Sequence, residues 1–168
     1  MPKLIKLTQD KFAIVDDGDY EYLIQWKWFA KKAGRENNDK FYAARTGDIG
    51  NGKRGTIRMH RVLLGLSHND KRMPDHIDRN GLNNQRDNLR IATRRQNNAN
   101  RNSGKNSSSI FIGVCWHKKH KKWYVQIMNN GYKTWVGCFD NEHEAALAYN
   151  AAAIKIHGEF ANLNIITK

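Results

Sequence analysis

Residues 64–102 form a stretch that is rich in Asn, Asp and Arg and poor in large apolar side chains. A stretch of this kind buries little apolar surface to offset the entropy that its backbone loses on folding. It therefore needs a specific reason to be ordered. This feature divides the chain into a first part with strand patterns, a polar middle, and a last part with strand and helix patterns.

The first part, residues 4–63, has the pattern of short strands separated by turns. Runs that favour strands occur at 12–15, 22–26, 41–44 and 56–60. Turn residues cluster between them at 16–19 and at 50–52. We therefore predict a β-rich N-terminal segment over residues 1–63.

The last part follows residues 103–109, a polar run without periodicity that we interpret as a linker between domains. Runs at 110–116, 123–128 and 133–139 predict three strands, with hairpin turns at 118–122 and at Asn129-Asn130-Gly131. Asn141 with Glu144 three residues later, an alanine-rich run, and Gly158 predict a capped helix. Residues 110–168 thus predict a three-stranded antiparallel sheet packed on one helix, and the whole chain an α+β fold.

The charge of the chain favours a polyanionic partner. Its 168 residues include 29 Lys and Arg against 16 Asp and Glu, a formal net charge of +13, and residues 61–110 are the most basic, with 10 Lys and Arg against 4 Asp. Basic side chains gain affinity for nucleic acids by releasing the counterions condensed on phosphates. Solubility alone, or an anionic membrane surface, is the alternative explanation.

Several classes of protein are disfavoured by composition. No apolar run approaches the length of a membrane span, and residues 1–7 lack the apolar region of a secretory signal, so we expect a cytoplasmic protein that is not secreted. Cys115 and Cys138 are the two cysteines and form no CxxC pair, so a metal would be held by oxygen or nitrogen. Cys115, His117 and His120 lack a fourth ligand for zinc.

The middle part has the pattern of a strand-loop-strand-helix unit. Strands are predicted at 75–78 and 89–92, and Thr93 with Gln96 predicts the capped start of a polar helix. Asp75 and Asn97 offer the hard oxygen ligands that suit Mg²⁺. A neutral His76 beside them can take the proton of a water that attacks a phosphorus atom.

The span 60–102 closely resembles HNH endonucleases of the phage and homing type, through Asp75-His76, Asn88 and Asn97 at their spacing. The resemblance implies an HNH nuclease domain over 1–102 with a ββα-metal core at 64–102. It implies that His76 is the general base, that Asp75 and Asn97 bind Mg²⁺ or Mn²⁺, and that Asn88 braces the loop and the histidine. It further implies phosphodiester hydrolysis, with one strand nicked by a monomer or both cut by a dimer, and a phage or bacterial mobile element as the setting.

Residues 110–165 resemble the AP2/ERF-type DNA-binding domain. The matching residues are Gly113-Val114, Trp123, Gly137, Phe139, Ala145-Ala146, Ala148-Tyr149, Ala152-Ala153, Gly158 and Ala161-Asn162-Leu163-Asn164. The resemblance implies that the sheet lies in the major groove of duplex DNA with the helix behind it. Ile112, Cys115 and Met128 stand where plant members use arginines for base contacts, so the fold transfers more safely than the sequence preference.

Charge and aromatic patterning indicate two sets of candidate DNA-binding residues. Near the predicted active site the charges are nearly all positive, which favours phosphate contacts; these candidates are Arg79, Arg86, Arg94, Arg95, Asn98 and Arg101. On the predicted sheet, aromatic and basic side chains are interleaved, as is typical of a surface that reads a groove; these candidates are Trp116, His117, Lys119, Lys133 and Trp135.

Three interpretations are open at this point. The first is a metal-dependent nuclease that is targeted by the AP2-like domain. The second is a DNA-binding regulator without catalysis, in which the nuclease segment is a relic, and the third is a nuclease selective for RNA or for nucleic-acid structure. The presence of all four motif residues favours the first. His60 is either a phosphate or metal contact or a hydrogen-bonded core residue.

Overall fold

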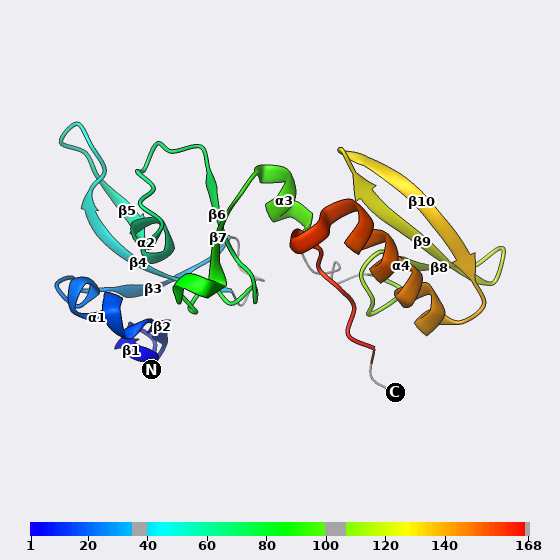
Figure 1. The fold of residues 1–168 in the computed structure, drawn as a ribbon, viewed down its shortest axis with the longest axis horizontal. Helices are drawn as coiled ribbons and strands as arrows, with labels where there is room; N and C mark the ends of the chain where they lie inside the picture. The colour runs from blue at the N-terminus through cyan, green and yellow to red at the C-terminus, as the bar shows by residue number, and fades with distance from the viewer. Residues whose placement is uncertain (35–39, 100–106, 167–168) are drawn as a thin grey trace. The chain divides into compact units, whose positions relative to one another are not determined.

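The protein divides into two compact units, Met1–Thr93 and Arg94–Lys168. Figure 1 shows its fold as a computed structural model, which describes residues 1–34, 40–99 and 107–166. The second unit begins ahead of the linker predicted at 103–109, because helix α3 (Arg94–Ala99) contacts the 3-10 turn η2 (Gly158–Phe160). Ser109, the last residue of that predicted linker, is buried in the second unit.

The first unit is built from small antiparallel sheets. Strands β1 (Lys3–Lys6) and β2 (Phe12–Val15) form one hairpin, and β6 (Met73–His76) and β7 (Leu89–Ala92) form another. A three-stranded sheet has the order β3-β4-β5, with β3 (Phe29–Lys32), β4 (Phe41–Asp48) and β5 (Arg54–Arg58). Between the strands lie helices α1 (Asp17–Leu23) and α2 (Met59–Leu63) and the 3-10 turn η1 (Arg86–Asn88).

Two of the local predictions in this unit are wrong. The segment predicted as a turn at 16–19 and a strand at 22–26 forms α1, whose first turn carries Asp17 and Asp19. Acidic residues there are favoured by the positive end of the helix dipole. The strand predicted at 56–60 ends at Arg58, and Met59 and His60 begin α2.

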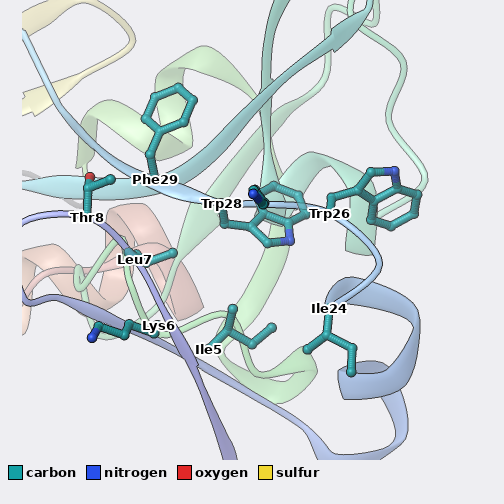
Figure 2. Close-up of a pocket in the computed structure, with 9 residues that line it drawn as sticks. Ile5, Lys6, Leu7, Thr8, Ile24, Trp26, Trp28 and Phe29 are labelled. Atoms are coloured by element: carbon teal, nitrogen blue, oxygen red, sulfur yellow. The ribbon is translucent and has the colours of Figure 1, made fainter.

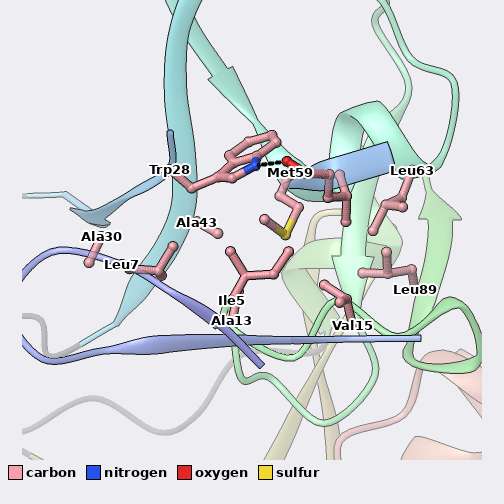
Figure 3. Packing of buried hydrophobic residues seen from close by; sticks show 11 residues of the cluster. Ile5, Leu7, Ala13, Val15, Trp28, Ala30, Ala43, Met59, Leu63 and Leu89 are labelled. Carbon is pink, nitrogen blue, oxygen red and sulfur yellow. Dashed lines mark hydrogen bonds between the residues drawn. The ribbon is translucent and has the colours of Figure 1, made fainter. Parts of the chain in front are cut away.

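One hydrophobic core joins the N-terminal segment to the β6–β7 hairpin (Figure 3). Met59 of α2 and Leu23 of α1 are fully buried in it, and Leu89 of β7 is buried in it too. The Trp28 indole donates a hydrogen bond of 2.8 Å to the Leu23 carbonyl, which satisfies its buried polar atom. Because Leu89 pairs with His76, this core determines where the histidine strand lies.

The second unit confirms the predicted sheet and helix. Its antiparallel sheet has the order β10-β9-β8, with β8 (Val114–His117), β9 (Lys122–Asn129) and β10 (Tyr132–Phe139). Helix α4 (Glu142–His157) lies against the sheet (Figure 1), and the Asn141 side chain accepts hydrogen bonds from the backbone at 143 and 144. The α+β class is confirmed.

Alanines let α4 lie close to its sheet. Ala145, Ala146 and Ala153 are fully buried against Val125 and Ile127 of β9. The opposite face of the sheet is therefore the one left exposed, since successive strand residues point to alternate faces. In the described part of the chain, no helix has both the length and the apolar character needed to span a bilayer.

Candidate functional site

The β6–β7 hairpin places Asp75 and His76 side by side at the end of a strand. Asp75 pairs with Arg90 and His76 with Leu89 in the antiparallel register. Both side chains are buried, each being 5% exposed. Neighbouring residues of a strand point to opposite faces, so the carboxylate and the imidazole enter different surroundings.

Asp75 lies in a buried ion pair with Arg90. The Arg90 Nε donates to Asp75 Oδ2 at 2.9 Å, and Arg90 Nη2 lies 2.9 Å from the same oxygen. A buried carboxylate needs such a partner because burial removes its hydration. The pair fixes the Asp75 side chain on the strand that carries His76.

His76 is enclosed by two other rings. Its ring centroid lies 5.0 Å from that of His60, nearly perpendicular to it, and 5.9 Å from that of Tyr42. Burial lowers the pKa of His76, against the raising effects of the Asn84 side chain and of Asp78 and Asp75. The imidazole is therefore neutral at pH 7, which is the state that a general base requires.

His60 belongs to the same ring cluster, in α2 rather than in a strand. It is 3% exposed, and its ring lies 5.4 Å from that of Tyr42. Burial, with smaller effects of His76, Arg58 and Arg61, lowers its pKa to about 2. Among the described residues its Nδ1 has no hydrogen-bond partner, and the buried ring fits the position of a core residue that the sequence offered as one alternative.

Asn84 faces the histidine, a contact that no motif in the sequence indicated. It is fully buried, and its Oδ1 lies 3.5 Å from His76 Nε2. Its Nδ2 donates to the Leu82 carbonyl at 3.0 Å, which orients the amide oxygen toward His76. The Asn84 backbone N–H donates to the Ile14 carbonyl at 2.7 Å, so β2 of the N-terminal segment holds this loop in place.

Asn88 closes the loop between the two strands. Its Nδ2 donates to Asp78 Oδ1 at 3.0 Å and to the Asn83 carbonyl at 2.8 Å. Its Oδ1 accepts a bond of 3.0 Å from the Asp78 backbone. These contacts are those of a residue that braces the loop.

The predicted phosphate-binding residues differ in their burial and in their bonding partners. Arg86 forms a bidentate pair with Asp19, with distances of 2.7 and 2.8 Å, and so has a structural partner in α1. Arg79 is half-buried in the loop, and Arg94 is exposed at the start of α3. The side chains of Arg95 and Asn98, and all of Arg101, lie outside the described residues.

The predicted metal ligands, Asp75 and Asn97, offer the oxygen donors that suit a hard cation. Asp75 contributes a carboxylate that is shared with Arg90. Asn97 is half-buried in α3, which belongs to the second unit, so its approach to Asp75 stays a prediction. Within residues 1–34, 40–99 and 107–166, no three His, Cys, Asp or Glu side chains form a metal-binding cluster.

The exposed face of the second unit's sheet carries a row of rings from all three strands. His117 stacks on Tyr124 at 4.3 Å between centroids, and Tyr124 meets Trp135 edge-on at 4.7 Å. Lys133 lies exposed on the same face, and Lys119 lies in the β8–β9 turn. Trp116 shares its face with buried Val114 instead, so the register does not bring it to this row.

A surface pocket of about 490 Å³ lies elsewhere on the first unit (Figure 2). Its lining comes from Ile5, Lys6, Leu7, Thr8, Ile24, Trp26, Lys27, Trp28 and Phe29. None of the predicted site residues lines this pocket, and its walls are mostly apolar. The residues that the sequence predicts for catalysis therefore lie outside this pocket.

Comparisons with known proteins relate both halves of the chain to nucleic-acid proteins. The chain is 28% identical over 160 residues to an uncharacterized HNH endonuclease of Acanthamoeba polyphaga mimivirus, covering 92% of this chain and 75% of the relative. It is 42% identical over 62 residues to dehydration-responsive element-binding protein 2D of Arabidopsis thaliana. The chain is an HNH endonuclease homologue with an AP2/ERF-like segment.

A further relative matches 52% of the chain. The HNH homologue is 32% identical over 87 residues to protein 3.8 of Escherichia phage T7 and covers 71% of that protein. The match to the Arabidopsis protein covers 36% of this chain and only 30% of the plant protein, so it concerns the AP2/ERF-like segment alone. No protein-family model and no solved structure matches the chain.

Proposed function

We propose that this HNH homologue is a DNA endonuclease that hydrolyses phosphodiester bonds with Mg²⁺ or Mn²⁺ and nicks duplex DNA as a monomer. The observation that carries the proposal is His76, a buried neutral imidazole directly beside buried Asp75. The AP2-like unit targets the nuclease to its DNA. A dimer, or two successive visits, would be needed to cut both strands.

His76 acts as the general base in this proposal. Asn84 Oδ1 is an acceptor, so a neutral His76 facing it carries its proton on Nε2. The lone pair on Nδ1 then takes the proton of the attacking water. His60 and Tyr42 hold the ring from two sides, which keeps the base oriented during the reaction.

Asp75 and Asn97 are the proposed ligands of the divalent ion. A carboxylate oxygen and an amide oxygen are the hard donors that Mg²⁺ and Mn²⁺ accept. Bound there, the ion would neutralise charge on the scissile phosphate and on the leaving oxygen. Arg90 orients Asp75, and Asn88 keeps the loop closed beside His76.

The remaining candidates contact the DNA in this proposal. Arg79, Arg94, Arg95, Asn98 and Arg101 reach phosphates near the nuclease site, and Arg86 does so only by releasing Asp19. His117, Lys119, Lys133 and Trp135 contact DNA from the second unit, whereas Trp116 supports the sheet from its helix side. The short matches to plant proteins support DNA binding by this unit.

A plasmid assay tests the proposal. Supercoiled plasmid is incubated with Mg²⁺ and wild type, His76→Ala, or the matched control His68→Ala, an exposed histidine of the same unit. We expect His76→Ala to lower the nicking rate by about 10²- to 10⁴-fold, the usual contribution of a general base, and His68→Ala to match wild type. RNA serves as the second substrate and separates a DNA nuclease from an RNA nuclease.

The second candidate function is a DNA-binding regulator with a relic nuclease segment. The ion pair of Asp75 with Arg90 favours it, because an arginine competes with a cation for the carboxylate. If neither wild type nor His76→Ala relaxes plasmid while both retard duplex DNA in a gel, the regulator is the correct interpretation.

A further inference from the structure

The tip of the second unit's sheet is a two-stranded ribbon. Strand β8 pairs with β9 only over residues 122–125, whereas β9 and β10 stay paired as far as Asn129 and Tyr132. The ribbon over residues 126–135 therefore starts at the edge of the third strand, where the Gln126 backbone N–H still bonds to the Gly113 carbonyl, and projects beyond it from residue 127 on. A two-stranded ribbon of this kind fits the width of the DNA major groove.

Four side chains of the ribbon share its exposed face. Gln126 lies opposite Trp135, and Met128 lies opposite Lys133. Residues opposite each other in an antiparallel pair point to the same side. Met128 is 49% exposed and Trp135 is 50% exposed, while Ile127, on the other face, is buried against α4.

The amide of Gln126 is available for a ligand. Among the described residues its side chain makes no hydrogen bond, and the bond that Gln126 does make joins its backbone N–H to the Gly113 carbonyl. The polar rings on the same face are already engaged: His117 Nδ1 accepts a bond of 3.2 Å from the His120 backbone, and the ring stacks on Tyr124. Gln126 is thus the uncommitted amide of this surface.

The cations of the ribbon argue against guanine as its target. From residue 102 to the end of the chain there is no arginine, and Lys133 is the one lysine on the ribbon face. Recognition of guanine by arginine or lysine is the commonest specific contact in protein–DNA complexes, and of the two only arginine offers a rigid planar fork. We assign the flexible ammonium of Lys133 to a phosphate instead.

We infer that the ribbon reads A·T base pairs, with the Gln126 amide on adenine and with Met128 and Trp135 against thymine methyl groups. A glutamine amide matches the N6 donor and N7 acceptor of adenine, and apolar side chains contact the thymine methyl in the same groove. Lys133 anchors the ribbon to a phosphate. This inference rests on the proposed DNA binding by the AP2-like unit and names the bases that it recognises.

The test selects bound duplexes from a pool of random sequence, using the full-length chain in metal-free buffer so that cleavage does not remove them. The affinity for a selected duplex, and for single A·T to G·C changes in it, is then measured by fluorescence anisotropy at one salt concentration. Wild type is compared with Gln126→Ala, Gln126→Arg and Thr134→Ala. Thr134 is the matched control, since it is exposed on the paired strand β10 of the same ribbon but on the opposite face.

At one A·T pair we expect the change to G·C to weaken wild-type binding by about 5- to 150-fold, the range of a good bidentate contact. Gln126→Ala should lose this discrimination, Gln126→Arg should prefer G·C at that pair, and Thr134→Ala should behave as wild type. Unchanged discrimination in Gln126→Ala, or G·C preference in wild type, overturns the inference while DNA binding stands. Failure of wild type to retain any duplex overturns the proposed DNA binding as well.

Discussion

The two units of this HNH homologue keep their polar functional groups in opposite environments. In the first unit His60 and His76 are buried, and their rings contact each other. In the second unit the rings of His117, Tyr124 and Trp135 form a row on the sheet face opposite α4. Burial in the first unit changes the protonation of the two histidines, whereas the rings of the second unit stay accessible to a ligand.

The ion pairs of the two units differ in the same way. The side chains of Asp75 and Arg90 are 6% and 14% exposed, whereas those of Asp140 and Lys122 are 82% and 41% exposed. Burial makes a charge depend strongly on its partner, while water and salt screen an exposed pair. The comparison teaches that changes to a buried site also change the stability of the unit that contains it. Changes to an exposed DNA-binding surface need not do so.

Removal of the buried carboxylate should have the largest effect on stability. Asp75→Ala leaves Arg90 charged and without its partner in the interior, and we expect a loss of about 3–5 kcal/mol in the unfolding free energy of the first unit. Hydrogen exchange read by mass spectrometry measures the two units separately. Protection in the second unit should not change.

A double variant shows whether the loss of stability comes from breaking the ion pair or from removing the Asp75 side chain itself. Asp75→Ala with Arg90→Leu removes both charges and should recover much of the stability, because replacing a whole buried pair by apolar groups is often neutral. A single variant as stable as wild type would break the comparison between the units. If Asp75→Ala destabilises the first unit as expected, Asn97→Ala is the better variant for testing metal binding in cleavage assays.

Acidification should destabilise the first unit through His60. Its pKa is about 2 in the folded protein and about 6.5 when unfolded, so folding disfavours the protonated form. Stability is complete above pH 6.5 and falls as the pH drops below it, by at most about 1.4 kcal/mol per pH unit for this one group. Urea unfolding from pH 7 to pH 5 measures the slope.

The variant His60→Phe keeps a ring in the cluster and removes the titrating group. Its unfolding free energy should depend less steeply on pH than that of wild type, although His76, whose pKa is also lowered, keeps part of the slope. Equal slopes for the two proteins would mean that His60 is hydrated in the folded state. The ring cluster would then be as open as the row on the second unit.

Elements with local signals were predictable from the sequence. Strand β7 spans 89–92 as predicted, and the Asn-Gly pair at 130–131 forms the turn between β9 and β10. Asn141 caps α4, as its spacing to Glu144 indicates. Each of these features depends on residues a few positions apart, which a pattern can capture.

The contacts that complete the first site were not predictable, because they join distant segments. Asn84 faces His76 only because β2 binds its loop through Ile14, about 70 residues earlier in the sequence. Arg86 is paired with Asp19, which lies in a helix where the sequence predicted a turn. The sequence indicated which side chains were candidates for the site. It did not indicate which distant residues they would bond to in the folded protein.

The exposed ion pair of the second unit should have the smallest effect. Lys122 lies 3.0 Å from Asp140, and both side chains are well exposed to solvent. Lys122→Ala, Asp140→Ala and the double variant should therefore unfold in urea at the same midpoint as wild type within error, and 1 M salt should not separate them. A double-mutant cycle on this pair, set beside the cycle on Asp75 and Arg90, measures the contrast directly. A coupling as large as that of the buried pair would show that the sheet face is shielded from water, and the second unit could not then serve as a freely accessible reading surface.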